Sequence, residues 1–353
     1  MTSLPETVDA AVGLDRAAHA QAMVGWGCRL EDGYVVNREK IREYARAVQD
    51  FHPVHWDQRV ARDFGYSGLI ATPTFASVIA IHAQARLFET LALDYGLDEV
   101  VQTDQVIEFH RPITAGDRLV CEAYLHSWRR AFGGDLLTTR TLLTDHRHRL
   151  VLETYTSYVA RPRRTDAERL ILDGAQAISP EPSTANSAPT PIRFQALTAE
   201  PSIEPATPLR PAVHARRFDE MAVGRELPPH TVCLTTGDLV NYAGVSGDTN
   251  PIHWDRAAAA QFGFDTVVAH GMLTLGLAAA FVTAWLGDPG ALRGLSARMT
   301  SPVHVSDHEA GRIRFTGKVK SMDPATRTAV AALTAEHAGR RIFGRATATV
   351  QLA

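Results

Sequence analysis

The sequence repeats a short motif at an interval of 198 residues, and this duplication limits the folds that the chain can adopt. At this offset Tyr44, Asp50, Pro53 and His55 fall on Tyr242, Asp248, Pro251 and His253. The interval is far longer than the unit of a solenoid repeat, which is about 20–50 residues, so each copy has the size of a whole domain. The chain of 353 residues therefore predicts two tandem copies of one fold.

The second copy of the motif gathers functional groups in a loop. A carboxylate, a carboxamide and an imidazole stand close together there, and the neighbouring Gly and Pro prevent a regular helix. A bend at Asn250-Pro251 can bring Asp248 and His253 toward one point, where the pair can hold a water or a substrate hydroxyl. The same residue types are common in turns and helix caps, and Asp255 is a candidate cap, so a purely structural loop is the alternative.

An apolar run from Met272 to Leu286 follows this loop. It is hydrophobic on every side, which indicates a helix buried in a protein core rather than an amphipathic surface helix. The N-terminus of that helix, near Gly271, points toward the loop in this interpretation. Its first free N–H groups can receive negative charge that develops on a carbonyl oxygen.

The run YAGVSGDTNPIHWD together with AHGMLTLG resembles the hydratase signature of the MaoC-like family, the (R)-specific enoyl-thioester hydratases and (3R)-hydroxyacyl-thioester dehydratases. The resemblance implies a hot-dog fold, in which an antiparallel sheet wraps a long helix. It also implies catalytic roles for Asp248 and His253 and an oxyanion-binding N–H at Gly271. We expect Asn250 to orient these groups. We further expect the substrate to contact Ser246, Pro251, His270, Met272, Pro73, Thr74 and Phe75.

The resemblance extends over both copies. Residues from about 218 to 353 resemble a HadB-type dehydratase subunit, and residues from about 23 to 161 resemble its HadA-type partner, so the chain looks like a fusion of the two. This implies fatty-acid elongation on long acyl chains carried by acyl-carrier protein or coenzyme A. It implies neither an organic cofactor nor a metal.

The pattern of the remaining sequence predicts an α+β double hot-dog. Asn37 is a candidate cap for a helix that precedes the first loop. Helical runs are expected at 74–93 and 272–286, each followed by strand-like segments that alternate apolar and polar residues. The strands are expected at 100–109, 117–128, 136–144 and 151–158 in the first copy, and at 295–300, 312–321, 328–336 and 342–352 in the second. Since each copy alone would expose a sheet edge, we expect an intramolecular pseudo-dimer, with further homodimerisation left open.

Composition suggests the boundaries between the copies. Residues 162–212 hold eight prolines between Pro180 and Pro211, amid Ala, Ser and Thr, which favours an extended linker. We therefore expect a flexible tail at 1–22, a HadA-like domain at 23–161, this linker, and a catalytic HadB-like domain at 213–353. The RPRR run at 161–164 is interpreted as a solvated charge cluster, with a patch for a carrier protein or coenzyme A phosphates as the alternative.

Charge and cysteine content exclude several function classes. A net charge of −3 argues against a nucleic-acid-binding protein. The three cysteines lie far apart, which fits a reducing cytoplasm, and neither a signal peptide nor a membrane span is predicted. His52, His55 and Asp57 are close in sequence but lack a further spaced ligand group, so no metal site is expected.

Only one of the two loops is predicted to be catalytic. The first retains Asp50 and His55, which makes it a candidate degenerate site. At the 198-residue offset, however, Pro73 stands in the place of Gly271, and proline has no N–H to bind an oxyanion. The first copy is therefore expected to form a wall for the acyl chain, although Thr74 can supply an N–H if the register differs by one.

Two other functions remain open at this stage. A hot-dog thioesterase would use Asp248 to activate water at the thioester carbonyl, and a non-catalytic protein would only bind acyl thioesters. The presence of an Asp and His pair favours the hydratase and dehydratase interpretation.

Overall fold

The computed structural model describes residues 18–90, 100–131, 134–160, 194–199 and 212–353. The two halves repeat one order of elements. The first half contains β1 (Gly27–Leu30), β2 (Tyr34–Val35), α2 (Arg38–Ala47), η1 (Pro53–His55), α3 (Gln58–Asp63), α4 (Ser77–Thr90), β3 (Val100–Phe109), β4 (Arg118–Ala131), β5 (Gly134–Asp145) and β6 (Leu150–Ala160). A short strand, β7 (Phe194–Leu197), lies between the halves in the sequence.

The second half repeats this order with small additions. It contains η3 (Phe218–Glu220), β8 (Glu226–Leu234), α6 (Thr236–Ser246), η4 (Pro251–His253), α7 (Arg256–Gln261), β9 (Val267–Val268), α8 (Gly271–Leu286), η5 (Pro289–Ala291), β10 (Leu292–Met299), β11 (His304–Val305), β12 (Gly311–Asp323), β13 (Thr328–His337), β14 (Arg340–Arg341) and β15 (Phe343–Gln351). The helix α2 is capped by Asn37, as predicted, and its counterpart α6 is capped at the equivalent position, Thr235. Asn37 accepts a hydrogen bond from the Glu39 N–H, and Thr235 forms a capping box with Asp238.

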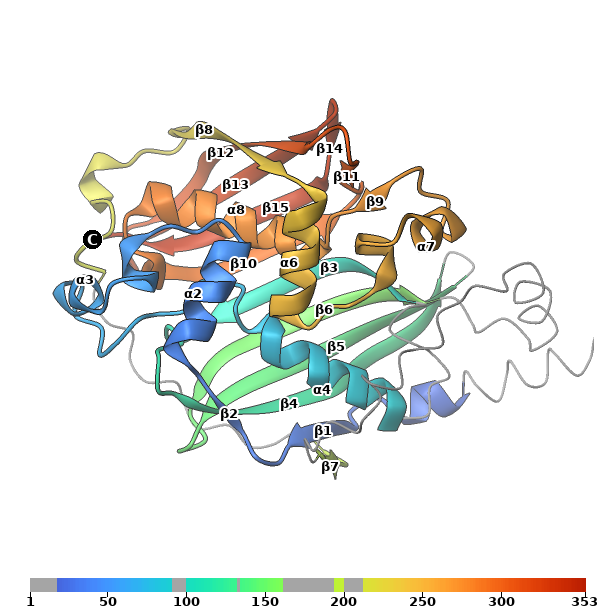
Figure 1. Cartoon of the computed structure of the whole chain (residues 1–353). Helices are drawn as coiled ribbons and strands as arrows, with labels where there is room; N and C mark the ends of the chain where they lie inside the picture. The colour runs from blue at the N-terminus through green and yellow to red at the C-terminus, as the bar shows by residue number, and fades with distance from the viewer. Residues whose placement is uncertain (1–17, 91–99, 132–133, 161–193, 200–211) are drawn as a thin grey trace, which may run out of the picture.

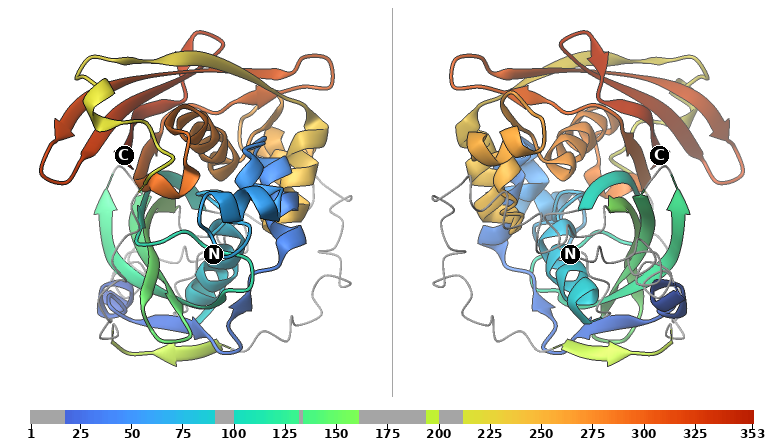
Figure 2. Two further views of the ribbon diagram at one scale, coloured as in Figure 1. Left: turned by 90° about the vertical axis from the view of Figure 1, so that its left-hand side faces the viewer. Right: turned by 90° about the vertical axis from the view of Figure 1, so that its right-hand side faces the viewer.

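Within the described residues, one antiparallel sheet runs through both halves in the order β7-β1-β4-β5-β6-β3-β10-β15-β13-β12-β8. The halves join where β3 pairs with β10, for example Ile107 opposite Leu295. Each half of the sheet curves around its own long helix, α4 or α8, and α2 packs beside α6 across the junction (Figures 1 and 2). This arrangement confirms the predicted α+β double hot-dog and its dimer-like packing.

The structure refines several boundaries. The helix expected at 74–93 begins later, at Ser77, because residues 73–76 form turns first, and residues 91–99 lie outside the described part of the chain. The strands β1 and β8 were not predicted. Both are short or interrupted by prolines, which weakens their alternation.

The predicted tail and linker also need correction. Residues 18–22, placed in the tail, form a helical turn in which Ala20 is buried. Phe194–Leu197, placed in the linker, form β7, which pairs antiparallel with β1 and extends the sheet. The rest of both segments, at 1–17, 161–193 and 200–211, lies outside the described residues, as does the RPRR run.

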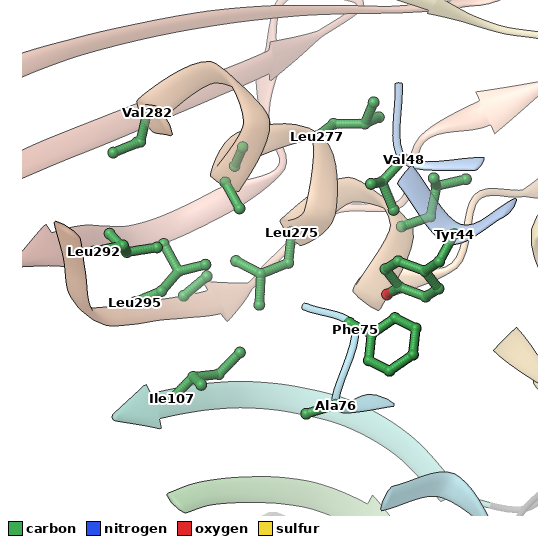
Figure 3. Packing of buried hydrophobic residues seen from close by; sticks show 14 of the residues in the cluster. Tyr44, Val48, Phe75, Ala76, Ile107, Leu275, Leu277, Val282, Leu292 and Leu295 are labelled. Atoms are coloured by element: carbon green, nitrogen blue, oxygen red, sulfur yellow. The ribbon is translucent and has the colours of Figure 1, made fainter. Parts of the chain in front are cut away.

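The helix α8 is buried on nearly all sides, as its uniform apolar sequence predicts (Figure 3). Its neighbours come from both halves, including Val48 at the end of α2 and Ile107 on β3. Gly276 is the point of closest approach. A Cβ built on Gly276 would lie 2.7 Å from a methyl of Val48 and 3.0 Å from the hydroxyl of Thr74, so only glycine fits there.

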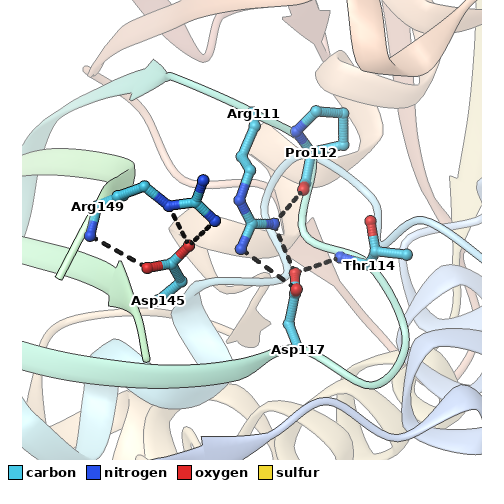
Figure 4. Close-up of polar contacts among 6 residues, drawn as sticks. All are labelled: Arg111, Pro112, Thr114, Asp117, Asp145 and Arg149. Carbon is cyan, nitrogen blue, oxygen red and sulfur yellow. Dashed lines mark hydrogen bonds and ion pairs between the residues drawn. The ribbon is translucent and has the colours of Figure 1, made fainter. Parts of the chain in front are cut away.

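Charged side chains fix the turns at one end of the first half (Figure 4). Arg111 donates to Asp117 at 2.7 and 3.2 Å, and Asp117 also accepts from the Thr114 N–H. In the hairpin that joins β5 and β6, Asp145 accepts from two side-chain nitrogens of Arg149. These charge-assisted bonds stabilise the connection between β3 and β4 and the turn between β5 and β6.

Within the described residues, none of the helices is both long and apolar enough to cross a bilayer.

The contact at Gly276 predicts a stability effect. Gly276→Ala should lower the free energy of unfolding by about 1–3 kcal/mol, because the added methyl group overpacks the junction of the halves. Gly244→Ala, in the neighbouring α6, is the matched control: its Cβ meets nothing within 4 Å. That variant should be neutral or more stable by about 0.5–1 kcal/mol. Equal effects of the two substitutions in urea unfolding would contradict the packing argument.

Candidate active site

The loop between α6 and α7 combines structural and free functional groups. Gly247 ends α6 in the left-handed conformation, with φ of 83°. The side chain of Asn250 accepts from the Ile252 N–H and caps η4, and Asp255 accepts from the Ala257 N–H and caps α7. The turn-and-cap interpretation thus accounts for Asn250 and Asp255. Asn250 orients the loop itself. Asp248 accepts only a long bond, 3.4 Å, from the Asn250 N–H through one carboxylate oxygen, so its side chain and that of His253 are the candidates for a chemical role.

A backbone carbonyl sets the tautomer of His253. Its Nδ1 lies 2.7 Å from the carbonyl oxygen of Val268, in β9. Because a carbonyl can only accept, Nδ1 carries a hydrogen, and the lone pair of the neutral ring is on Nε2. Burial lowers the pKa of His253, and the Asp248 carboxylate offsets only part of this effect. His253 is therefore neutral near pH 7, with a basic Nε2.

A second histidine, His270, packs against the loop between α6 and α7. His270 is fully buried and stacks on His253, with ring centroids 3.7 Å apart. Its Nε2 donates to the backbone carbonyl of Asp248 at 3.1 Å, and its Nδ1 has no hydrogen-bond partner. Burial and the neighbouring His253 keep the pKa of His270 well below its usual range. Two neutral imidazoles and a carboxylate thus lie together, with ring nitrogens and a carboxylate oxygen within 4.8 Å of one another.

The geometry of this trio does not suit a metal ion. The rings of His253 and His270 are only 26° from parallel, so their in-plane lone pairs point along nearly parallel planes and do not converge on one ion. A second trio of possible ligands, Glu108, His110 and Glu153, is also poorly suited, because Arg140 donates to Glu153 at 2.6 Å. Two of the residues considered as metal ligands from the sequence have structural roles: Asp57 caps α3 and His52 caps η1.

The N-terminus of α8 lies beside this trio. The helix begins at Gly271 with His270 as its cap, and the first N–H in its interior to bond back is that of Thr274, to the His270 carbonyl. The N–H groups of Gly271, Met272 and Leu273 therefore have no partner within the helix. Gly271 and Met272 are partly exposed, whereas Leu273 is buried. The predicted oxyanion donor and the acid–base pair are thus brought together.

The corresponding groups of the first half are in a different state. His55 is bound through Nδ1 to the Ile70 carbonyl at 2.7 Å, as His253 is to Val268, but its Nε2 lies 3.3 Å from an oxygen of Asp50. Burial lowers the pKa of His55, yet the Asp50 carboxylate more than offsets this and leaves the pKa raised. With 0% and 3% of their surface exposed, His55 and Asp50 form a closed ion pair. Neither is accessible to a substrate.

The start of α4 also differs from the start of α8. Pro73 is buried and has no N–H, and the Phe75 and Ser77 N–H groups already bond to the Thr72 and Thr74 carbonyls. The turn thus lacks the row of free donors present at Gly271. Thr74, whose N–H is the alternative donor, is buried, and its carbonyl accepts from the Tyr44 hydroxyl.

The predicted first-half wall residues must be corrected. Pro73, Thr74 and Phe75 lie in the core at the junction of the halves, and Phe75 packs edge-on against Tyr44 at 5.6 Å. The displacement follows from the later start of α4, which leaves 73–76 in a buried turn. Tyr44 in turn meets its repeat partner, Tyr242, hydroxyl to hydroxyl at 3.3 Å.

A cavity of about 390 Å³ lies between the halves instead. Its lining residues are Leu30, Tyr34, Lys40, Val78, Ile79, His82 and Ala83 from the first half and Gly244, Val245, Ser246 and Gly247 from the second. The cavity extends to Gly247, the residue before Asp248. Of the expected substrate-binding residues only Ser246 lines it, whereas His270 and Met272 lie at the start of α8 and Pro251 begins η4. The contribution of β1, β2 and α4 was not foreseen, because it depends on how the halves pack.

Comparison with known proteins agrees with the fold. Residues 22–154 match the FAS1-like dehydratase domain region, and residues 220–337 match the MaoC like domain. A solved MaoC-like dehydratase is 41% identical, with 95% of this chain and 100% of that chain covered and a TM-score of 0.83.

Two further relatives cover part of the sequence or the fold. A UPF0336 protein of Mycobacterium tuberculosis is 41% identical over 139 residues, which are 39% of this chain and 88% of that protein. A conserved hypothetical protein of the same species, described as a double hot-dog, is 17% identical, with 91% of this chain and 94% of that chain covered and a TM-score of 0.59, a likeness of fold alone. On the sequence identity and full coverage of the solved dehydratase, the chain belongs to the MaoC-like dehydratase family.

Proposed function

We propose that the protein is a (3R)-hydroxyacyl-thioester dehydratase that also runs in reverse as an (R)-specific enoyl-thioester hydratase. One observation carries the proposal. The Val268 carbonyl fixes a neutral His253 with its basic Nε2 free, beside Asp248 and the open N-terminus of α8. A base, a second proton-transfer group and an oxyanion donor are what this elimination requires.

The steps follow from these positions. The thioester carbonyl of the substrate accepts the Gly271 N–H, which acidifies the C2 hydrogen. Nε2 of His253 removes that proton as the C2–C3 double bond forms and the C3–O bond breaks. The proton passes from His253 to the departing C3 hydroxyl through Asp248 or a water, so that the hydroxyl leaves as water and both side chains return to their starting states. General acid–base assistance of this kind contributes about 10²–10⁴ in rate. Loss of one oxyanion donor costs about 10²–10³.

The first half serves as a binding partner in this proposal. Its Asp50 and His55 form a closed structural pair, and its β1, β2 and α4 line the cavity beside the loop of Asp248. That cavity is mainly apolar, which suits part of an acyl thioester. Acyl-carrier protein or coenzyme A would carry the substrate, with long-chain fatty-acid elongation in the cytoplasm as the proposed setting.

The leading alternative is a thioesterase, and a non-catalytic acyl-thioester binding protein is the other. The dehydratase should consume enoyl-CoA with loss of its conjugated absorbance while releasing no free thiol. A thioesterase would release thiol at the same rate as it consumed the substrate. A binding protein would do neither, although it would still quench or shift a bound fluorescent acyl thioester.

The two loops should respond differently to substitution. Asp248→Asn and His253→Ala should each lower kcat by at least about 10²-fold, because each removes a proton-transfer group. The matched double variant Asp50→Asn with His55→Gln removes both charges of the first loop together, since removing only one leaves a buried charge unpaired at a cost of about 3–5 kcal/mol. This variant should keep most of the activity. If a folded double variant were as inactive as Asp248→Asn, the one-site proposal would be wrong.

The state of His253 predicts a pH profile. Dehydration needs His253 neutral, and burial holds its pKa below the usual 6.5. The value of kcat/KM should therefore rise with pH and level off, with the midpoint of the acid limb below 6.5. Circular dichroism over the same range should show a folded protein. A midpoint above 7 would contradict the assignment of a buried neutral base.

A further inference from the structure

Gln102, on β3 of the first half, points toward the active site of the second half because of an irregularity in its strand. The pairing of β3 with β6 shifts between Gln102, opposite Tyr158, and Asp104, opposite Ser157, so Thr103 is an extra residue. In a regular strand Gln102 and Gln105 would face opposite sides of the sheet. The bulge turns Gln102 to the inner side, where it meets Gln105. Bulges of this kind commonly re-aim a side chain beside an active site.

A chain of buried hydrogen bonds fixes the position of Gln102. Its Nε2 donates to Oε1 of Gln105 at 2.9 Å, and the Thr156 hydroxyl donates to the same oxygen at 2.9 Å. Thr156 accepts from Gln84 on α4 at 3.2 Å, and Gln84 accepts from the Tyr158 hydroxyl at 2.9 Å. At the 198-residue offset Gln84 corresponds to Val282, an apolar residue of α8, so the second half does not repeat this chain.

The other N–H of the Gln102 amide has only a weak acceptor. Its Nε2 lies 3.5 Å from the thioether sulfur of Met272, and sulfur is a poor acceptor that a carbonyl oxygen can readily replace. Met272 is the second residue of α8. The Gln102 side chain also lies next to Gly271, since its Oε1 is 3.6 Å from the position of a Cβ built there. The amide oxygen thus lies beside Gly271, and the amide nitrogen lies beside Met272, the next residue at the start of α8.

We propose that Gln102 is a catalytic residue that the first half supplies to the site of the second. Its Nε2–H is the second donor to the thioester oxygen, beside the Gly271 N–H, and takes the place now held by the sulfur of Met272. The inference rests on the proposed dehydratase function. It gives the first half a direct part in the reaction, in addition to lining the cavity.

A structural role would give a different result. If the hydrogen-bonded chain only fills the core, Gln102 could be replaced by an apolar residue of similar length with a change in stability and little change in kcat. If Gln102 binds the oxyanion, the loss must fall on kcat, because the charge on the oxygen is larger in the transition state than in the bound substrate.

Two variants and one control separate these cases. Gln102→Met keeps the length of the side chain and removes the donor, and it should lower kcat by about 10²–10³-fold with a smaller change in KM. Gln102→Glu replaces the donor with a negative charge near the oxyanion and should be at least as slow. Asp104→Asn is the control on the same strand, because Asp104 faces outward and pairs with the exposed Arg298. That variant should keep the wild-type kcat.

A spectroscopic measurement tests the contact itself. The carbonyl stretch of enoyl-CoA bound to the slow Asp248→Asn protein should lie at lower frequency than in the Asp248→Asn, Gln102→Met double variant, because the amide donor polarises the carbonyl. A folded Gln102→Met enzyme with wild-type kcat, or an unchanged stretch, would overturn the role of Gln102 alone. Lack of any hydration by the wild-type protein would instead overturn the proposed function.

Discussion

The antiparallel pairing of β3 with β10 is the interaction on which the rest of the structure depends. It pairs two strand edges that separate domains would expose, and it makes one sheet of both halves. The same pairing sets α2 against α6, so that the repeated tyrosines Tyr44 and Tyr242 meet. It also places the first half against the N-terminus of α8. A site built from both halves is a direct consequence of this junction.

The duplicated loops show how one motif can take two chemical states. Both histidines donate Nδ1–H to a backbone carbonyl at the same distance, 2.7 Å, so the local fold is the same. The difference lies at Nε2. In the first loop Asp50 takes that position and raises the pKa of His55, while in the second Asp248 remains partly exposed and His253 stays neutral. The first loop thus contains a buried ion pair, and the second contains a neutral histidine that can act as a base.

The difference at the helix starts reinforces this division. Gly271 begins α8 with N–H groups that have no partner within the helix, whereas Pro73 has no N–H and belongs to a buried turn ahead of α4. The proline and the later start of α4 at Ser77 together leave the first half without the exposed helix start that α8 has at Gly271. The bulge at Thr103 adds a further asymmetry, since it directs Gln102 from the first half toward Gly271.

The sequence by itself determined the duplication, the two long helices, most strands and the residues of the second loop, because these depend on periodicity, caps and spacing within short segments. It also identified Pro73 as a reason for one site. The tertiary structure alone decided the cavity wall, the ionisation of His55 and His253, and the contact of Gln102 with Met272. These depend on distances between residues far apart in the chain. They also depend on burial and on a strand bulge, none of which leaves a local signal in the sequence.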